Sequence, residues 1–451
     1  MARLWLRDPL AILAQDAARG LVVENDRILE LVPAGRAPVQ PVTGVFDASS
    51  HVLLPGLVNS HHHFYQTLTR ALGPALDKEL FGWLKALYPV WAGLDPEMLA
   101  VATELALSEL LLSGCTTASD HHYLYPVGLE QALDIQVDVA KRIGIRVVLT
   151  RGSMDLSEKD GGLPPDTLVQ ATDTILADCE RVVATHHQQG PGAMVQVALA
   201  PCSPFSVSRR LLRETAELAE RLDVRLHTHL GETQDENDFC SAHFGMRPLD
   251  YLEEVGWLSR RSWLAHGIHF SDAEIKRLGH AGTAVSHCPH SNMALASGLC
   301  PACALESAGS PVGLGVDGSA SNDASNVIEE VRAAFMLQRL REGAIKVSHL
   351  DALRWATVGG ARCLGRDDIG ELRAGAQADL ALFKLDALRH SGYHDPLAAL
   401  VLSGATRADR VMVAGKWRVE DGHAAHIDEL DLIHRHSAAA AILRQRAGLA
   451  G

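Results

Sequence analysis

The sequence contains no run of about 18 or more apolar residues, the length that a helix needs to cross a membrane. Its first residues, Met1–Asp8, interrupt a short apolar stretch with charge and do not resemble a signal peptide. Cysteine is also scarce, because the 451 residues include only eight cysteines and these have no regular spacing. Such usage indicates free thiols in a reducing compartment rather than a disulfide framework. We therefore expect a cytoplasmic protein that does not enter a membrane.

The chain also lacks an excess of basic residues. Its net charge is −14, and no basic patch stands out, whereas binding a phosphate backbone requires one. We expect no nucleic-acid partner, and a small neutral or modestly polar molecule as the ligand. Cys300 and Cys303 have the spacing of half a zinc knuckle, but no second pair matches them, so we interpret this pair as part of a loop.

Apolar residues make up 47% of the chain, and their order divides it into three parts. Residues 1–57 and 371–430 contain short strands separated by turns, and we expect these two segments to form one small β-sandwich domain. Residues 58–370 alternate strands with helices, which predicts a parallel sheet closed into a (β/α)8 TIM barrel inserted in that domain. Residues 431–451 should carry a terminal helix, clearest at 437–449. The plainest signals in the barrel are helices at 96–112, 167–184 and 208–221 and strands at 146–149, 195–199 and 224–229.

Three consecutive histidines, His61, His62 and His63, end an apolar run in the N-terminal part of the chain. His61 and His63 are spaced i, i+2, so their side chains point to the same face of a β-strand. Two imidazoles side by side at the end of a buried strand make half of a transition-metal site.

Four later predicted strands also end in potential ligands. One such residue alone has an ordinary explanation, because a strand-end histidine can be structural and a strand-end aspartate can cap a helix. However, barrel active sites are built at the carboxyl ends of the strands, where several strands here deliver such side chains in turn. Together they predict a metal site formed by the histidine run and some of the following residues: His227, His229 with Glu232, His266, His287 and Asp317.

The series His61-X-His63, His229, His266 and Asp317 resembles the amidohydrolase superfamily. The resemblance covers nearly the whole chain, since the split β-domain with its Gly-Glu-Leu and Ala-Asp-Leu segments is also similar. The stretch 55–63, the pair His229-X-X-Glu232 and the stretch 286–292 resemble the aminohydrolase branch. That branch deaminates purines, pyrimidines, pterins and triazines.

The resemblance implies one divalent metal per chain, held by His61, His63, His229 and Asp317. Members with two metals use a lysine at the end of the fourth barrel strand, and the corresponding segment 197–203 contains none. The superfamily uses Zn²⁺ most often and Fe²⁺ sometimes, and three imidazoles with one carboxylate suit either ion.

The resemblance also implies the roles of the remaining site residues. Asp317 would accept a proton from the attacking water, and Glu232 would protonate the substrate ring and then the departing ammonia. His266 would orient the water and the tetrahedral intermediate from the substrate side. Gln66 would bind the substrate, because an amide can donate to and accept from a lactam edge.

Other histidines are expected to play lesser parts. His62 faces away from its neighbours, and His227 should lie one barrel layer deeper and donate to a carboxylate. His121 and His122 follow another strand, where they could line the pocket, with His122 as a candidate substrate contact. The segment 71–91, with Leu76, Phe81, Trp83 and Leu87, is either an apolar lid or a packed helix, and we expect His434 and His436 to be solvated.

The identity of the substrate is the most detailed of these expectations. Guanine deaminases carry an arginine in a Thr-Pro-Arg-Phe loop after strand 4, whereas this chain has Ala-Pro-Cys-Ser-Pro-Phe at 200–205. The stretches 59–70, 120–126 and 317–323 are more similar to deaminases of 8-oxoguanine and hydroxylated triazines. We therefore predict hydrolysis of 8-oxoguanine to urate and ammonia by a homo-oligomer.

Other functions stay open. A guanine, pterin or hydroxy-s-triazine aminohydrolase is the first alternative. A ring-opening cyclic amidohydrolase is disfavoured because the strand-4 lysine is absent, and a non-catalytic relative would normally have lost ligands. A deaminase of the cytidine type is excluded, since no His-X-Glu occurs in the chain.

Overall fold

The computed structural model describes residues 3–425 and 427–449, and its centre is a closed barrel of eight parallel strands. Strands β7 and β8 pair directly, and the circle closes through β14 and β7. This confirms the predicted barrel. The barrel strands are β7 (Leu57–Asn59), β8 (Cys115–His122), β9 (Arg146–Ser153), β10 (Val195–Pro201), β11 (Leu226–Leu230), β12 (Ser262–His266), β13 (Ala284–His287) and β14 (Val312–Leu314).

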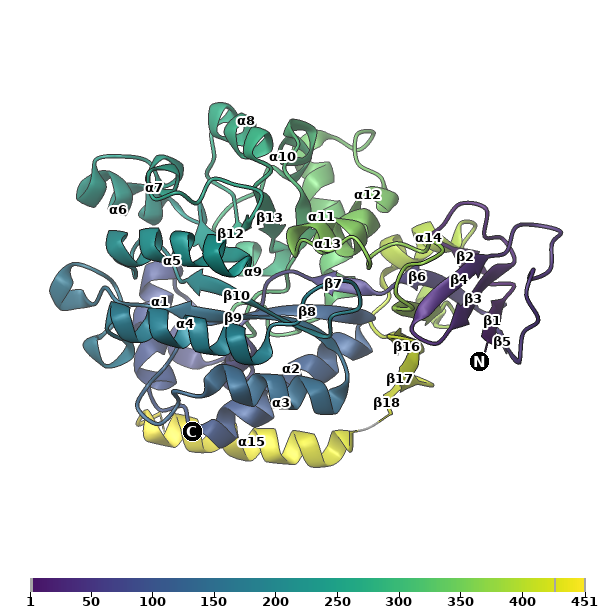
Figure 1. Ribbon diagram of the computed structural model, residues 1–451, viewed down its shortest axis with the longest axis horizontal. Helices are drawn as coiled ribbons and strands as arrows, with labels where there is room; N and C mark the ends of the chain where they lie inside the picture. Colours follow the sequence, from purple (N-terminus) through teal and green to yellow (C-terminus); the bar gives the residue numbers. More distant parts are fainter. Residues whose placement is uncertain (1–2, 426, 450–451) are drawn as a thin grey trace.

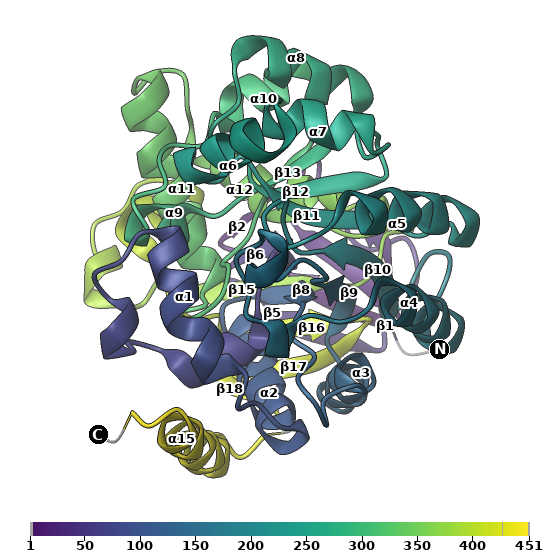
Figure 2. The same cartoon turned by 90° about the vertical axis from the view of Figure 1, so that its left-hand side faces the viewer.

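Helices surround the barrel, as the view in Figure 2 shows. Helix α5 illustrates why: Ser208 caps its first turn, and Leu211, Thr215 and Leu218 repeat at helical spacing and are buried. Among the described residues, no helix is long and apolar enough to cross a membrane. The α-helices are α1 (Leu80–Trp91), α2 (Pro96–Leu112), α3 (Ala132–Ile143), α4 (Thr172–His186), α5 (Arg209–Leu222), α6 (Gln234–Phe244), α7 (Pro248–Glu254), α8 (Asp272–Ala281), α9 (Pro289–Ala294), α10 (Ala302–Ala308), α11 (Val327–Glu342), α12 (His349–Arg354), α13 (Gly360–Cys363), α14 (Pro396–Ala399) and α15 (Glu429–Arg446). Short 3-10 or π turns are η1 (Phe64–Thr69), η2 (Gly73–Ala75), η3 (Glu158–Asp160), η4 (Asp166–Leu168), η5 (Trp355–Gly359), η6 (Leu388–His390) and η7 (Leu400–Gly404).

The two ends of the chain form two sheets on one side of the barrel (Figure 1). In the larger sheet, β15 from the C-terminal part pairs antiparallel with β6 from the N-terminal part, so both ends build one unit. Apolar side chains from both ends, including Leu21, Leu53 and Leu382, form a shared core there. The strands are β1 (Arg3–Arg7), β3 (Gly20–Glu24), β4 (Arg27–Leu31) and β5 (Gly44–Asp47) in one sheet, and β2 (Ala11–Ile12), β6 (His51–Pro55), β15 (Leu380–Lys384), β16 (Arg410–Val413), β17 (Lys416–Glu420) and β18 (His423–Ala424) in the other.

The C-terminal helix α15 begins earlier than the sequence suggested and lies along α2, away from the two sheets (Figure 1). Asp428 caps its first turn, because its carboxylate accepts from the amides of Leu430 and Asp431. His434 is exposed as expected, but the expectation for His436 was wrong. That ring is buried with its Nε2 3.0 Å from Thr67 Oγ1, since it lies on the inner face of a helix rather than in a solvated tail. Residues 450 and 451 of the predicted helical segment lie outside the described residues.

A buried ion pair joins the barrel to the larger sheet. Arg146, the first residue of β9, donates from Nε and Nη2 to Asp379 Oδ2 and Oδ1 at 3.0 and 3.2 Å. The two side chains are 0% and 2% exposed. Ala414 N also donates to Asp379 Oδ1 at 2.7 Å, so the carboxylate ties together three segments that are far apart in sequence.

Asp379→Ala should lower the free energy of unfolding by about 3–5 kcal/mol, because it leaves the buried Arg146 guanidinium without a counter-ion. Denaturant unfolding followed by circular dichroism measures this change. The matched control is Asp173→Ala, which removes an ion pair with Arg210 whose side chains are 81% and 56% exposed and should leave the midpoint unchanged. Equal midpoints for the two variants would contradict the structural role of Asp379.

Candidate active site

The predicted site residues gather at the carboxyl ends of the barrel strands. His61 and His63 follow β7, His229 lies in β11, His266 ends β12, and Asp317 follows β14. All five are buried. His266 and Asp317 also have φ angles of 71° and 62°, a left-handed conformation that is uncommon outside glycine and that clusters at functional sites.

Backbone carbonyls fix the ring orientation of two of the histidines. His63 Nδ1 is 2.6 Å from the carbonyl oxygen of His121, and His229 Nδ1 is 2.8 Å from that of Cys202. Because a carbonyl only accepts, each Nδ1 carries the proton and each Nε2 of a neutral ring is bare. Burial lowers the pKa of His61 and His229 well below the usual range, which keeps these rings neutral.

The bare nitrogens converge with a carboxylate oxygen. His63 Nε2 lies 3.2 Å from His229 Nε2, and Asp317 Oδ1 lies 3.3 Å from both His61 Nε2 and His63 Nε2. His61 Nε2 is buried without a hydrogen-bond partner among the described residues. Two facing lone pairs repel each other unless a cation lies between them, and ligands about 2.0–2.1 Å from a tetrahedral zinc are about 3.3 Å apart. The donor set therefore fits a single divalent metal.

The structure adds His121 to this cluster and places His122 elsewhere. His121 lies parallel to the His229 ring, with centroids 4.7 Å apart, and its Nε2 is 3.0 Å from the Ala200 carbonyl oxygen. One nitrogen of His121 lies with nitrogens of His61 and His229 in a group that could hold a metal. His122 points to the other face of β8, as strand alternation requires, and is hydrogen-bonded to the Leu124 carbonyl at 2.6 Å. His122 does not line the cavity described below, so the structure does not bring this predicted substrate contact together with the other site residues.

Glu232 and His266 face each other beside the donor set. Glu232 Oε2 is 3.4 Å from His266 Nε2, which in turn is 3.8 Å from Asp317 Oδ2. Burial raises the pKa of Glu232 well above its usual value, and the nearby charge of Asp317 raises it further. A raised pKa favours the protonated carboxyl of Glu232, the form that can act as an acid.

Two adjacent residues of α9, Ser291 and Asn292, hold Asp317 and His266. Ser291 Oγ donates to Asp317 Oδ2 at 2.7 Å, and Asn292 Oδ1 lies 3.0 Å from His266 Nδ1. Their neighbouring side chains thus orient two different site residues. The Ser-Asn pair ends the stretch 286–292 that carried the family resemblance, but the sequence did not reveal which side chains it contacts.

Gln66 lies in η1, directly after the histidine run, and is buried. Its Oε1 accepts from Ala320 N at 3.4 Å, and the side chain lines the cavity described below. Gly318 fits beside this amide only because it has no side chain, since a Cβ there would be 1.9 Å from Gln66 Oε1.

The cavity above the donor set is small, with a volume of about 30 Å³, room for one or two water molecules. Helix α1 covers it with Leu80, Trp83 and Leu84, so this segment is both a packed helix and a cover. Trp83 Nε1 donates to the Ala320 carbonyl at 3.2 Å. None of the described lining residues is arginine or lysine: they are His63, Gln66, Leu80, Trp83, Leu84, Tyr88, Tyr123, Cys202, Phe205, His229, Glu232, His266, Leu295, Asp317 and Ser321.

Cys202 lies at the floor of this cavity, in the loop where guanine deaminases were expected to carry an arginine. Its Sγ is 3.8 Å from His229 Nδ1, and burial raises the pKa of the thiol to about 12. Cys202 is therefore a neutral lining group, which agrees with the missing cationic clamp inferred from the sequence.

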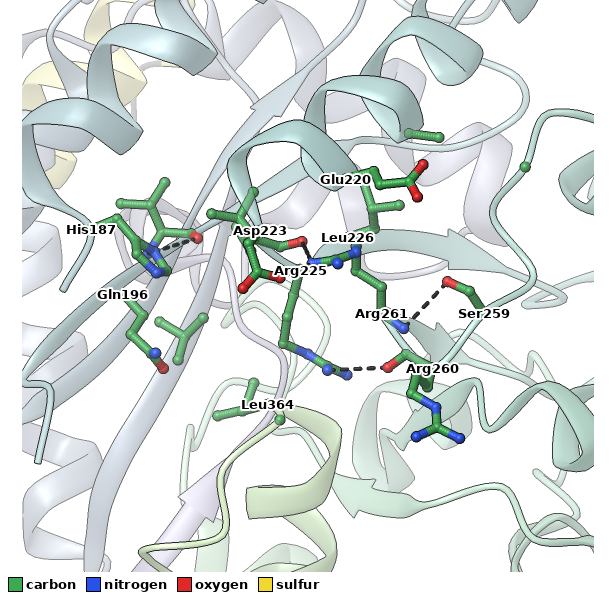
Figure 3. A pocket seen from close by; sticks show the side chains of 17 residues that line it. His187, Gln196, Glu220, Asp223, Arg225, Leu226, Ser259, Arg260, Arg261 and Leu364 are labelled. Atoms are coloured by element: carbon green, nitrogen blue, oxygen red, sulfur yellow. Dashed lines mark hydrogen bonds and ion pairs between the residues drawn. The ribbon is translucent and has the colours of Figure 1, made fainter. Parts of the chain in front are cut away.

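A larger cavity of about 560 Å³ lies at the opposite, amino-terminal ends of β10 and β11 (Figure 3). Arg225 crosses it and donates to the carbonyls of Arg260 and Cys363 at 3.1 and 2.8 Å. None of the predicted site residues lines it. Because barrel enzymes act at the carboxyl ends of their strands, the smaller cavity is the candidate active site.

Comparison with known proteins assigns the class. The model of the amidohydrolase family matches residues 52–418, so the chain belongs to the amidohydrolase family. It is 64% identical over 446 residues to 8-oxoguanine deaminase from Pseudomonas aeruginosa, covering 98% of this chain and 99% of the relative. It is 39% identical over 411 residues to hydroxydechloroatrazine ethylaminohydrolase from Pseudomonas sp., covering 89% of this chain and 85% of that one.

A solved structure supports the same family and fold. The atrazine chlorohydrolase TrzN from Arthrobacter aurescens TC1, complexed with zinc, is 30% identical and superposes with a TM-score of 0.91. The match covers 98% of this chain and all of that one.

Proposed function

We propose that the protein is a metal-dependent aminohydrolase that converts 8-oxoguanine and water to urate and ammonia. The observation that carries this proposal is the position of Glu232, a buried carboxyl beside His266 and next to the donor set of His61, His63, His229 and Asp317. The choice of 8-oxoguanine rests on the relative that is 64% identical over nearly the full length of both chains.

His61, His63, His229 and Asp317 would hold one zinc or iron ion. Such an ion would supply a water molecule that can be deprotonated near neutral pH. Zinc is our preferred metal because the TrzN structure is a zinc complex and the donor spacing matches a tetrahedral site.

The protein's own residues then handle the protons. Asp317 accepts one from the attacking water while Ser291 holds its other oxygen. Glu232 donates to the ring nitrogen next to the attacked carbon, and the water oxygen forms its bond to that carbon. Glu232 then passes to the exocyclic amine the proton that Asp317 took from the water, the C–N bond breaks and ammonia leaves, and the hydroxyl proton released as the new carbonyl forms returns to Glu232. His266, oriented by Asn292, hydrogen-bonds to the oxygen that is added.

Gln66 and the cover helix would recognise the ring. The amide of Gln66 can donate to a substrate carbonyl, while Tyr123, Trp83 and Phe205 offer aromatic surface. A bicyclic ring needs more room than 30 Å³, so the cover over the donor set, of which α1 is a part, would open before substrate binds. We also propose that the protein is cytoplasmic and that it forms a homo-oligomer. Light scattering of the purified protein would test the oligomeric state.

An ammonia-release screen tests the function. Guanine, 8-oxoguanine, isocytosine, pterins and hydroxy-s-triazines would be compared at equal concentration, with release of alkylamine followed for N-alkylated triazines and metal content measured on the same sample. We expect the highest kcat/KM for 8-oxoguanine and about one metal per chain. Preference for a hydroxytriazine would support the second candidate function, a hydroxy-s-triazine aminohydrolase, which the similarity to the 39% identical ethylaminohydrolase favours. No ammonia from any of them would overturn the deaminase proposal, and two metals per chain would favour a ring-opening amidohydrolase.

Gly318→Ala should lower kcat/KM by about 10-fold to 100-fold while the metal stays bound, because the new methyl group displaces the Gln66 amide. Gln66→Ala should cause a similar loss by itself. In the double variant the two losses should not add, since both act through one amide. Independent, additive losses would show that Gly318 acts elsewhere.

A further inference from the structure

His61 differs from the other two proposed histidine ligands in what holds its ring. Backbone carbonyls orient His63 and His229, but His61 Nδ1 lies 2.8 Å from another imidazole nitrogen, His227 Nε2. An imidazole nitrogen can donate or accept, so this contact alone does not decide which ring carries the proton.

The other nitrogen of His227 shows which ring carries the proton between the two histidines. His227 Nδ1 lies 2.8 Å from the carbonyl oxygen of Trp263, which only accepts. Both histidine rings are fully buried, where a cationic imidazole without a counter-charge is costly. His227 is therefore neutral with its proton on Nδ1, its Nε2 accepts from His61 Nδ1, and His61 Nε2 is left bare toward Asp317.

Trp263 supports both ends of this chain of hydrogen bonds. Its ring stacks on the His227 ring, with centroids 4.3 Å apart and planes 13° apart. Its indole Nε1 donates to the carbonyl of Ser60, the residue before His61, at 3.0 Å. One residue of β12 thus fixes the orientation of His227 and the backbone that carries His61. The expected carboxylate partner of His227 is replaced here by a backbone carbonyl.

We propose that His227 is a positioning residue that relays the acceptor character of the Trp263 carbonyl to His61 and so locks His61 in the tautomer able to bind metal. The opposite tautomer would place a proton on His61 Nε2, 3.3 Å from Asp317 Oδ1, where it would form a hydrogen bond to the carboxylate and occupy the ligand's lone-pair direction. His227 and His229, two residues apart in β11, thus serve the same metal in different ways. The inference rests on the ligand set of the proposed function.

The test measures metal retention rather than activity. His227→Phe keeps the ring stack on Trp263 but removes both nitrogens, and His227→Gln supplies an amide oxygen that can accept from His61. The control is His287→Phe, the same change at another buried strand-end histidine, whose Nε2 lies 3.4 Å from Gln338 Nε2 rather than near a proposed ligand. Each protein would be loaded with Co²⁺ and mixed with a chelator, and loss of the visible cobalt bands would be followed.

We expect His227→Phe to lose cobalt about 10-fold to 100-fold faster than the wild type, with His227→Gln slower than His227→Phe and His287→Phe unchanged. Wild-type retention in His227→Phe would overturn the relay. Equal acceleration in the His287 variant would also overturn it, because it would show general loosening of the barrel.

A measurement on the unmodified protein covers the case in which His227→Phe does not fold. Two-bond ¹⁵N–¹H correlation spectra of the zinc-loaded wild type distinguish imidazole tautomers. We expect the proton of His227 on Nδ1, and a proton on Nε2 instead would refute the relay. If the wild type binds no metal at all, the proposed function fails. If the wild type binds metal and the His227 variants lose cobalt at the wild-type rate, only the role of His227 is refuted.

Discussion

Glu232→Gln will release ammonia from 8-oxoguanine about a thousandfold more slowly than the wild type, and it will keep its metal. Glutamine has nearly the shape of the protonated glutamic acid, so the cavity beside His266 should stay intact. However, an amide cannot give a proton to the ring nitrogen or pass one to the leaving amine. General acid–base catalysis by one positioned group contributes about 10²–10⁴-fold, which sets the expected loss.

The measurement combines steady-state ammonia release with elemental analysis of the same preparation. Asp238→Asn is the matched control, because it makes the same acid-to-amide change on the exposed side of α6, near Glu232 in sequence but outside the cavity. That control should behave as the wild type. Activity in Glu232→Gln within about tenfold of the wild type would remove Glu232 from the proton transfers.

Much of the fold was predictable because it depends on local patterns. The helix expected at 96–112 is α2 at those bounds, and the strand expected at 195–199 lies within β10. The hydrophobic periodicity and the Asp95 cap are signals that neighbouring residues carry by themselves. The spacing of His61 and His63 predicted a shared face for the same reason, since strand alternation depends only on the backbone.

Other features depend on contacts between distant segments, which spacing does not encode. The direction of a histidine ring depends on which carbonyl it meets, and the carbonyls of His121, Cys202 and Trp263 become partners only when the barrel closes. His436 looked like part of a polar tail until α15 turned it toward Thr67. Alternation could have separated His122 from His121, because adjacent residues of a strand face opposite ways.

The lining of the cavity was the least predictable part. Trp83 and Tyr88 reach it from α1, and Ser321 from the loop after β14, so elements far apart in sequence meet there. Trp83 and Tyr88 are residue types found in any buried core, and only their position over the donor set makes them part of the cavity lining. Because the cavity lining comes from distant segments, the sequence indicated the type of reaction in more detail than the substrate.

His229→Ala will have the largest effect on the metal, because it removes the ligand whose bare nitrogen faces that of His63. Metal content should fall from about one per chain to a small fraction, and deamination should fall to background, because the ion loses one of its four proposed protein ligands. The variant should also lose the stabilisation that bound metal gives the folded state, which is about 4 kcal/mol when the free ion exceeds its dissociation constant a thousandfold. Elemental analysis after dialysis and thermal unfolding with and without added Zn²⁺ measure both effects.

His287→Ala is the control, since it removes another buried barrel histidine that lies outside the proposed donor set. Added Zn²⁺ should raise the Tm of the wild type and of this control but not that of His229→Ala. Full metal content in His229→Ala would take that residue out of the ligand set and would direct attention to His121, which belongs to the same group of possible metal donors.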